Sequence, residues 1–174
     1  MDNLQDAIPP EPYVSTKSTA PPSPPPLLWM CTVTCDVGAV VSLGGPAKHG
    51  ERRFVPILRG SVQGPELNGE LLEGGADWQV QRADGATEIS AHYAVRTPDG
   101  ALIEVQSDGL RHGPPDVMAR LARGEDVPPQ DYFFRTLVRL TTGHPEWLHL
   151  NKVMALAVGR REPTRVVLDF WRVG

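Results

Sequence analysis

The sequence predicts an all-β protein, a single antiparallel β-barrel of about eight strands with one short helix. Three observations lead to this prediction. Apolar and polar residues alternate along many short segments, glycine, proline and Asp-Gly turns separate those segments, and only one segment has the pattern of a helix. Closure into a barrel is favoured because it leaves no exposed sheet edge. The expected strands are 27–37, 53–63, 77–82, 87–96, 101–108, 132–141, 148–158 and 164–173.

The expected helix spans residues 114–123. Pro114 and Pro115 suit a first helical turn, and Asp116 is favoured at the positive end of the helix dipole. Gly124 can end the helix, because glycine adopts the left-handed conformation common after a last turn. In a barrel similar in architecture to the lipocalins, we expect this helix beside one opening.

The chain divides into two parts by composition. Residues 1–26 contain IPPEP and APPSPPP, which favour polyproline II and supply almost nothing to a core. We interpret them either as a disordered tail or as an arm lying on a neighbouring subunit. Residues 27–174 form the predicted barrel domain, which is long enough for a core of its own.

Charge and apolar content exclude several classes of protein. The formal net charge of −4 gives no general attraction to nucleic acid or to an anionic membrane. No apolar run reaches the roughly 20 residues of a membrane span, and the first residues lack the pattern of a secretory signal. In a strand, Cys31 and Cys35 lie about 13 Å apart at ~3.3 Å per residue, so we expect free thiols and a cytoplasmic protein.

Two Asp-Gly turns define hairpins, and apolar matching across each turn predicts its register. For the first turn, a two-residue loop pairs Trp78 with Ala91, whereas a three-residue loop pairs Trp78 with Ser90; we choose the former. For the second turn, a three-residue loop pairs Tyr93 with Val105, and we choose that register.

These registers give each hairpin an apolar and a polar face. The apolar face carries Trp78, Val80, Ile89, Ala91, Tyr93, Val95, Ile103 and Val105. The polar face carries Asp77, Gln79, Glu88, Ser90, His92, Arg96, Glu104, Gln106 and Asp108. The simplest interpretation places the first set in the core and the second in water. The alternative is that part of the polar set lines the mouth of the barrel.

The segment 108–113, DGLRHG, is expected to be the joint between a strand and the helix. Loops at strand ends place functional groups on a rigid scaffold, so Arg111 and His112 are candidate functional residues. We expect Arg111 to turn into the barrel mouth near Asp77 or Glu104. The alternative is a structural ion pair that supports the loop.

Most familiar motifs are absent. GELLEGGADW lacks the Lys-Ser/Thr of a P-loop, and the sequence has no Gly-x-Ser-x-Gly motif. The five histidines and two cysteines form no pair at a metal-binding spacing. We therefore expect neither a metal nor a cofactor. The alternative is a metal site assembled from residues on distant strands, which the spacing of residues along the sequence does not reveal.

Two later segments carry aromatic residues beside polar ones. In QDYFFRTLVRL, Tyr132 shares a strand face with apolar residues and Arg135 lies on the other face. In EWLHLNKV, Trp147 and Asn151 share a face. Core and solvent faces are the simplest interpretation, and an aromatic ligand or a contact with another subunit is the alternative for Trp147.

Several segments together resemble the DUF3237 family of small β-barrel proteins. They are GGADWQVQRADG, AHYAVRTPDGALIEV, DGLRHGPPDVMARLARGE, DYFFRT, NKVMALAVGRR and VVLDFWRV. They keep their order and spacing from about Leu27 to the C-terminus. The resemblance implies a closed barrel that forms a homo-oligomer. Two positions depart from bacterial relatives, Glu104 in place of an aromatic residue and Phe133 in place of a frequent tyrosine, and both change the polarity of a pocket.

The resemblance also implies a function, because some fungal members are associated with ring closure in aromatic natural-product pathways. The implied activity is a cofactor-independent cyclase that adds a phenol oxygen across a prenyl alkene (intramolecular hydroalkoxylation) during aromatic polyketide biosynthesis. This reaction needs an acid, a phenoxide stabiliser and a shaped cavity. The candidate catalytic residues are Asp77 and Glu104 as acids, Arg111 as phenoxide stabiliser and His112 as proton relay. The candidate substrate-binding residues are Trp78, Tyr93, Tyr132, Arg135, Trp147 and Asn151.

Two other functions stay open from the sequence. A non-catalytic barrel that binds a small hydrophobic or aromatic molecule needs the same cavity but no acid. An oligomeric structural protein would use the polar face only as an interface.

Overall fold

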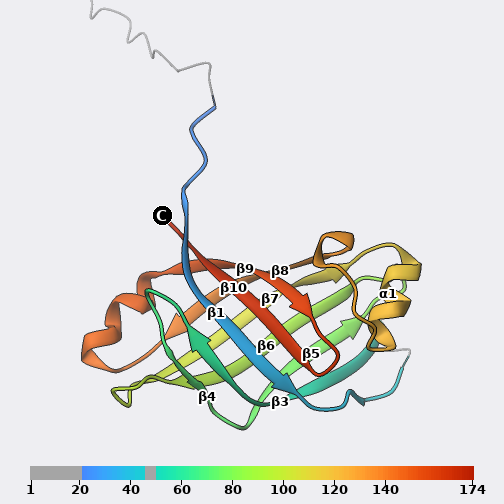
Figure 1. Cartoon of the computed structure of the whole chain (residues 1–174), viewed down its shortest axis with the longest axis horizontal. Coiled ribbons are helices and arrows are strands. Elements are labelled where there is room, and N and C mark those ends of the chain that lie inside the picture. Colours follow the sequence, from blue (N-terminus) through green and yellow to red (C-terminus); the bar gives the residue numbers. More distant parts are fainter. Residues whose placement is uncertain (1–20, 46–49) are drawn as a thin grey trace, which may run out of the picture.

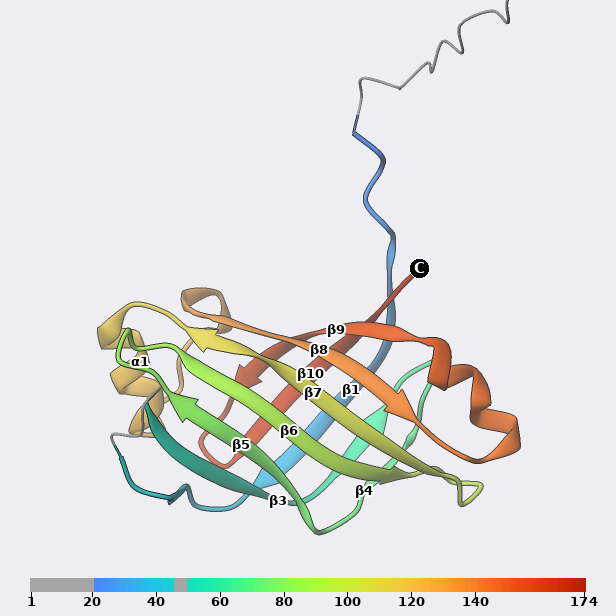
Figure 2. The ribbon, with the colours of Figure 1, turned by 180° about the vertical axis from the view of Figure 1, so that it is seen from behind.

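In the computed structural model, which describes residues 21–45 and 50–174, ten strands form one antiparallel sheet that closes on itself (Figures 1 and 2). Eight long strands make the barrel, and β2 and β4 are short additions. The predicted antiparallel barrel of about eight strands is confirmed. The strands are β1 (Leu27–Val37), β2 (Val41–Ser42), β3 (Glu51–Gln63), β4 (Gly69–Leu71), β5 (Gly75–Gln81), β6 (Thr87–Arg96), β7 (Leu102–His112), β8 (Phe133–Thr141), β9 (Met154–Arg161) and β10 (Arg165–Val173).

Strand β1 closes the barrel, because it pairs with β10 along one edge and with β3 along the other. From β5 to β10 each strand pairs antiparallel with the next one in the sequence, and helices lie in the β7–β8 and β8–β9 connections. Each long strand therefore has hydrogen-bonded neighbours on both sides, as expected of a closed barrel.

The predicted helix is confirmed as α1 (Pro115–Ala122), which lies at one end of the barrel (Figure 1). The described residues also contain two 3-10 helices, η1 (Pro129–Asp131) and η2 (Pro145–Lys152). The expected strand 148–158 is wrong over its first half, since η2 covers it and β9 begins only at Met154. Proline at the start of η2 fixes φ in the helical range and supplies no hydrogen-bond donor to a strand ladder.

The expected joint at residues 108–113 is not a loop, because β7 continues to His112. Gly109 permits this continuation: a Cβ there would lie 2.0 Å from the carbonyl oxygen of Arg135 on β8. The two strands thus approach closely at a position that only glycine fits. Side chains alternate along the extended strand, so Arg111 points inward and His112 points outward.

The predicted register of the first hairpin is wrong. Trp78 pairs with Ser90 and Asp77 pairs with Ala91, so the turn has a three-residue loop. Gly85 occupies it with φ of +87°. A slip of one residue exchanges the two faces of a strand, which sends Asp77 into the barrel and Trp78 to the outside.

The predicted register of the second hairpin is confirmed. Tyr93 pairs with Val105, and Val95 pairs with Ile103. The backbone N–H of Thr97 donates to the carbonyl of Ala101 at 3.0 Å and closes the three-residue loop.

The two ends of the barrel interior are filled differently. At the end covered by η2, large apolar side chains pack into a core, and the most buried of them include Met30, Val33, Val62, Leu67, Val95, Ile103, Leu150 and Phe170. At the end beside α1, shorter and polar side chains point inward and leave a cavity. Both Cys31 and Cys35 are buried free thiols on the inner face, as predicted.

None of the helices in the described part of the chain has the length and apolar character needed to cross a membrane. Residues 1–20 of the predicted tail or arm lie outside the described residues. Residues 21–26 are exposed, have no regular secondary structure and lead away from the barrel (Figure 1).

Removal of residues 1–26 should leave the barrel folded. Among the backbone groups of residues 21–26, only the carbonyl of Pro26 bonds to the barrel, where it accepts from the Gly174 N–H at 3.0 Å, and a single exposed hydrogen bond contributes about 1 kcal/mol. Thermal unfolding of the truncated chain should give a melting temperature within about 4 °C of the full chain. A larger loss would show that the segment packs against the barrel or against another subunit.

Candidate functional site

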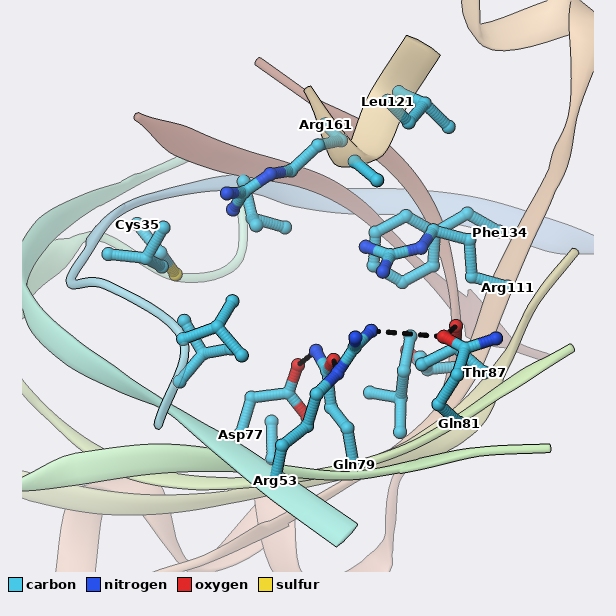
Figure 3. A pocket seen from close by; sticks show the side chains of 18 of the residues that line it. Cys35, Arg53, Asp77, Gln79, Gln81, Thr87, Arg111, Leu121, Phe134 and Arg161 are labelled. Carbon is cyan, nitrogen blue, oxygen red and sulfur yellow. Dashed lines mark hydrogen bonds between the residues drawn. The ribbon is translucent and has the colours of Figure 1, made fainter. Parts of the chain in front are cut away.

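A cavity of about 490 Å³ occupies the α1 end of the barrel (Figure 3). Its volume lies in the range of small-molecule sites. Most of its wall is apolar, contributed by Val55, Ile57, Ile89, Met118, Leu121, Phe134, Val166 and Leu168. Against this wall stand a few polar side chains: Arg53, Asp77, Gln79, Gln81, Thr87, Ser107, Arg111 and Arg161.

Asp77 reaches the cavity from β5. The Gln79 side-chain Nε2 donates to Asp77 Oδ2 at 2.5 Å, and Oδ1 is buried with no hydrogen-bond partner among the described residues. Burial raises the pKa of the Asp77 carboxyl above its ordinary value, and this effect outweighs the hydrogen bond from Gln79 and the charge of Arg111. A carboxyl group in this position can hold a proton and present it to a ligand.

Arg111, from the end of β7, lies beside the ring of Phe134, with 5.7 Å between its Cζ and the ring centroid. Its Nε is buried and has no hydrogen-bond partner within residues 21–45 and 50–174. Burial, together with the nearby charge of Arg161, lowers the pKa of the guanidinium to about 10, and the charge of Asp77 partly opposes this shift. At neutral pH Arg111 is therefore charged but poorly solvated.

Arg161, from the end of β9, adds a second guanidinium to the same cavity (Figure 3). Burial lowers its pKa, which the charge of Asp77 partly opposes. Neither Arg111 nor Arg161 lies within ion-pair distance of a carboxylate in the described part of the chain. Charges that are poorly solvated and have no partner are costly, so an anionic group placed beside the two arginines would offset this cost.

The third arginine of the cavity is held by neutral groups. Arg53 Nε donates to Gln79 Oε1 at 2.9 Å, and its Nη2 donates to Gln81 Oε1 at 3.1 Å. Thr87 donates to the same Gln81 oxygen at 2.9 Å. This network joins β3, β5 and β6 across the barrel floor and immobilises Arg53 against Gln79.

Of the sequence-predicted site residues, the structure brings Asp77, Arg111 and Tyr93 to the cavity. Tyr93 is buried, its hydroxyl has no partner among the described residues, and burial raises its pKa. Tyr132 is also buried but lies behind the cavity wall, where its hydroxyl accepts the Arg161 backbone N–H at 2.8 Å. Tyr132 thus supports the strand that carries Arg161.

Four predicted site residues lie on the outer surface of the barrel. Glu104 is paired with His92 at 2.5 Å on the outer face, away from the cavity. His112 stacks on Phe133 outside the barrel, and Arg135 lies over the same ring. The remaining member of the group, Trp78, is about half exposed and packs against Phe54.

The last two predicted residues belong to the opposite end of the barrel. Trp147 donates from its indole nitrogen to Asp99 at 2.9 Å. Asn151 exchanges two hydrogen bonds with the backbone of Thr142. Both lie in η2, so they do not share one face of a strand as the sequence analysis expected.

Sequence reasoning missed Arg53, Gln79 and Arg161 as parts of the site. The alternation of side chains along a strand could have indicated Gln79, because Gln79 and Asp77 lie two residues apart and therefore share one face of β5. A three-residue loop after β5 turns that face inward. No group of three or more His, Cys, Asp or Glu side chains that could hold a metal occurs in the described residues.

The fold and the site together define a small closed β-barrel with an internal cavity. The family model for DUF3237, a protein family of unknown function, matches residues 25–173. The chain belongs to this family. A UPF0311 protein of Rhodopseudomonas palustris is 39% identical over 145 residues, which cover 83% of this chain and 94% of the relative.

Solved structures show the same barrel. A conserved protein of unknown function from Rhodopseudomonas palustris has a TM-score of 0.84 and 37% identity, covering 88% of this chain and 100% of that one. A β-barrel-like protein from Acinetobacter baumannii has a TM-score of 0.77 and 34% identity, covering 90% and 100%. An enzyme from Penicillium herquei has a TM-score of 0.67 and 20% identity, covering 89% and 98%; at this identity the likeness shows the fold alone.

The cavity should prefer an anion to a neutral molecule of the same shape. Naphthoate should bind at least tenfold more tightly than naphthamide, since a hydrogen bond to a charged group contributes about 1.5–3 kcal/mol. Arg161→Met should abolish this preference, and Arg135→Met, which removes an arginine from the outer face, should leave it unchanged. Calorimetric titration of the two compounds measures the difference, and equal affinities for both in the unmodified protein would contradict an anion site.

Proposed function

We propose that the barrel is a cofactor-independent acid–base cyclase that acts on a small prenylated phenol. One observation carries the proposal: Arg111, whose Nε is buried without a hydrogen-bond partner among the described residues, shares an apolar cavity with the buried carboxyl of Asp77. The arginine suits a phenoxide, the carboxyl suits a proton donor, and the apolar wall suits the hydrocarbon body of the substrate.

The proposed reaction is an isomerisation and needs no oxidant. Asp77 transfers its proton to one carbon of the prenyl alkene, whose π bond breaks. The phenol oxygen forms a bond to the other alkene carbon and loses its own proton, which returns the carboxyl to its protonated state. Arg111 and Arg161 stabilise the negative charge on the oxygen, and the ring of Phe134 faces the region where positive charge develops on carbon.

Of the sequence-derived roles, the proposal keeps Asp77 as the acid and Arg111 as the phenoxide stabiliser. It does not keep Glu104, His112 or Arg135 in the chemistry, because their side chains lie on the outer face. Arg161, and not the substrate-binding candidate Arg135, is the second arginine of the proposed site.

A binding module without catalysis is the second candidate, and the composition of the cavity favours it. Three of its charged groups are guanidiniums, which hold anions but do not exchange protons near neutral pH. Burial also raises the pKa of Cys35 to about 12, so this thiol supplies no base. In this alternative Asp77 only donates a hydrogen bond to the bound molecule.

Arg111→Lys tests the proposed function, because lysine keeps the charge and loses the planar fork of donors. With an ortho-prenylated naphthol as substrate, turnover to the cyclic ether should fall at least tenfold, about 1.4 kcal/mol in the barrier, and the melting temperature should change little. Arg135→Lys is the matched control on the outer face and should retain full turnover. Chromatography separates the ether from the phenol of equal mass.

The pH profile of the same assay assigns the acid. Turnover should fall as the pH rises through the raised pKa of Asp77, since only the protonated carboxyl donates, and Asp77→Asn should be inactive at every pH. Binding of the naphthol without any ether product would instead support the binding module.

We also propose that the barrel forms a homo-oligomer in a reducing, cytoplasmic setting. An apolar outer face runs across β1, β10, β9 and β8, where paired residues in register carry large apolar side chains. Its members are Leu27, Trp29, Leu137, Met154, Leu156, Trp171 and Val173. Such a contiguous patch exceeds the scattered apolar residues normal for a monomer, and an uncharged patch is complementary to its own copy.

Leu137→Glu should dissociate the oligomer, because Leu137 is 53% exposed on the β8 strand of this face and a carboxylate there would be buried in the interface. Light scattering after size exclusion should show the monomer mass. Leu58→Glu changes a similarly exposed leucine on β3, 45% exposed, and should leave the mass unchanged. If the unmodified protein is a monomer in solution, the proposal of a homo-oligomer is wrong.

A further inference from the structure

A row of three side chains, Arg53, Gln79 and Asp77, crosses the floor of the cavity (Figure 3). Arg53 Nε lies 2.9 Å from Gln79 Oε1, and Gln79 Nε2 lies 2.5 Å from Asp77 Oδ2. Gln79 is buried, with 6% of its surface exposed. The amide therefore has two fixed neighbours and little contact with water.

The direction of these hydrogen bonds follows from chemistry alone. A guanidinium only donates, so the oxygen of the Gln79 amide must face Arg53. The NH₂ group of the same amide must then face Asp77, and Asp77 Oδ2 must accept. When Asp77 is protonated, its proton is consequently favoured on Oδ1, because the carbonyl oxygen of a carboxyl group is a better acceptor for the amide than the hydroxyl oxygen is, and Oδ1 has no partner among the described residues.

We propose that Gln79 is the positioning residue of the site: oriented by Arg53, it keeps the Asp77 proton on Oδ1, the oxygen left for a ligand. The inference deepens the proposed function, on which the use of that proton rests. A protonated carboxyl without such a partner can carry its proton on either oxygen, and half of these arrangements present no donor to the ligand. Gln79 removes this ambiguity before the ligand arrives.

The other charged or titratable groups that face Asp77 do not perform this task. Arg111 on β7 and Arg161 on β9 act on Asp77 through their charge and make no hydrogen bond to it within the described residues. Cys35 on β1 and Tyr93 on β6 are weak acids that burial keeps protonated. Among the side chains of the described residues, Gln79 is the one that hydrogen-bonds to a single oxygen of this carboxyl, and the Ser90 backbone N–H also favours the charged form.

The variant Gln79→Glu distinguishes two possibilities for Asp77. Either Gln79 determines which oxygen carries the proton, or Asp77 is protonated without such control. One oxygen of the introduced carboxylate would take the place of the amide oxygen at Arg53. The other would meet Asp77 Oδ2, and two carboxyl oxygens at this distance must share a proton. The proton would move from Oδ1 to the contact between Asp77 and the introduced carboxylate, so Asp77 would stay protonated to higher pH and yet present no donor to the cavity.

The experiment uses the full chain without substrate, labelled with ¹³C at the carboxyl groups of aspartate and glutamate. In Gln79→Glu, the titration midpoint of Asp77 should rise by about one pH unit or more and couple to that of the introduced carboxylate, with a far-downfield proton resonance from the shared hydrogen bond. In Gln79→Leu, the midpoint should also rise, because a bond to the charged form is lost, but the downfield resonance should be absent. Gln63→Glu adds the same charge at an exposed position of β3 and should leave Asp77 unchanged.

An Asp77 midpoint that stays at its original value in Gln79→Glu or in Gln79→Leu would overturn the proposal, and so would a downfield resonance in the unmodified protein. Backbone amide spectra establish that each variant is folded, and the leucine variant supplies the test where the charged one does not fold. These readouts need no turnover. Failure of the ortho-prenylated naphthol to react would count against the proposed cyclase and leave the position of the proton as measured.

Discussion

The pairing of β1 with both β10 and β3 is the constraint on which the rest of the structure depends. Because this pairing closes the sheet, every long strand has one inner and one outer face, and the interior is bounded on all sides. Eight strands enclose a space just wide enough for side chains to fill. Whether a stretch of that interior becomes core or cavity is then decided by the size of the residues that point inward.

Along the barrel, inward residues change from large and apolar at the η2 end to short or polar at the α1 end. The first group excludes water and holds the strands in place, so the second group can stay apart without collapse of the wall. Asp77, Arg111 and Arg161 come from three strands and are held near one another only because the packed end fixes those strands. Rigid elements of this kind suit a site whose groups must be oriented before the ligand binds.

The charged groups of the cavity lower the free energy of unfolding, because they lose part of their hydration in the folded protein. Three guanidiniums and one carboxyl lie in a largely apolar space, and no ion pair compensates Arg111 or Arg161 within the described residues. An apolar residue at either position would remove a desolvation cost. Groups that break the rules of a stable core in this way are expected at sites of function, and here they share one cavity with Asp77, the one carboxyl of the described residues that buries an oxygen without a hydrogen-bond partner.

Local patterns in the sequence determined the fold class, the helix, the alternation along each strand and the register of the second hairpin, since these depend on neighbouring residues and on the chemistry of one turn. Alternation also marked Asp77 as a candidate, and the place of Arg111 near the end of a strand marked Arg111. The tertiary structure alone decided which face of β5 turns inward, because Ala83-Asp84-Gly85 and Asp84-Gly85 are both acceptable loops, and only packing around the closed barrel distinguishes them. It also decided that β7 continues past Gly109, because the close approach of β8 is a contact between distant residues. For the same reason Arg53, Gln79 and Arg161, far apart in sequence, form one site, whereas Glu104 and His112 lie outside it.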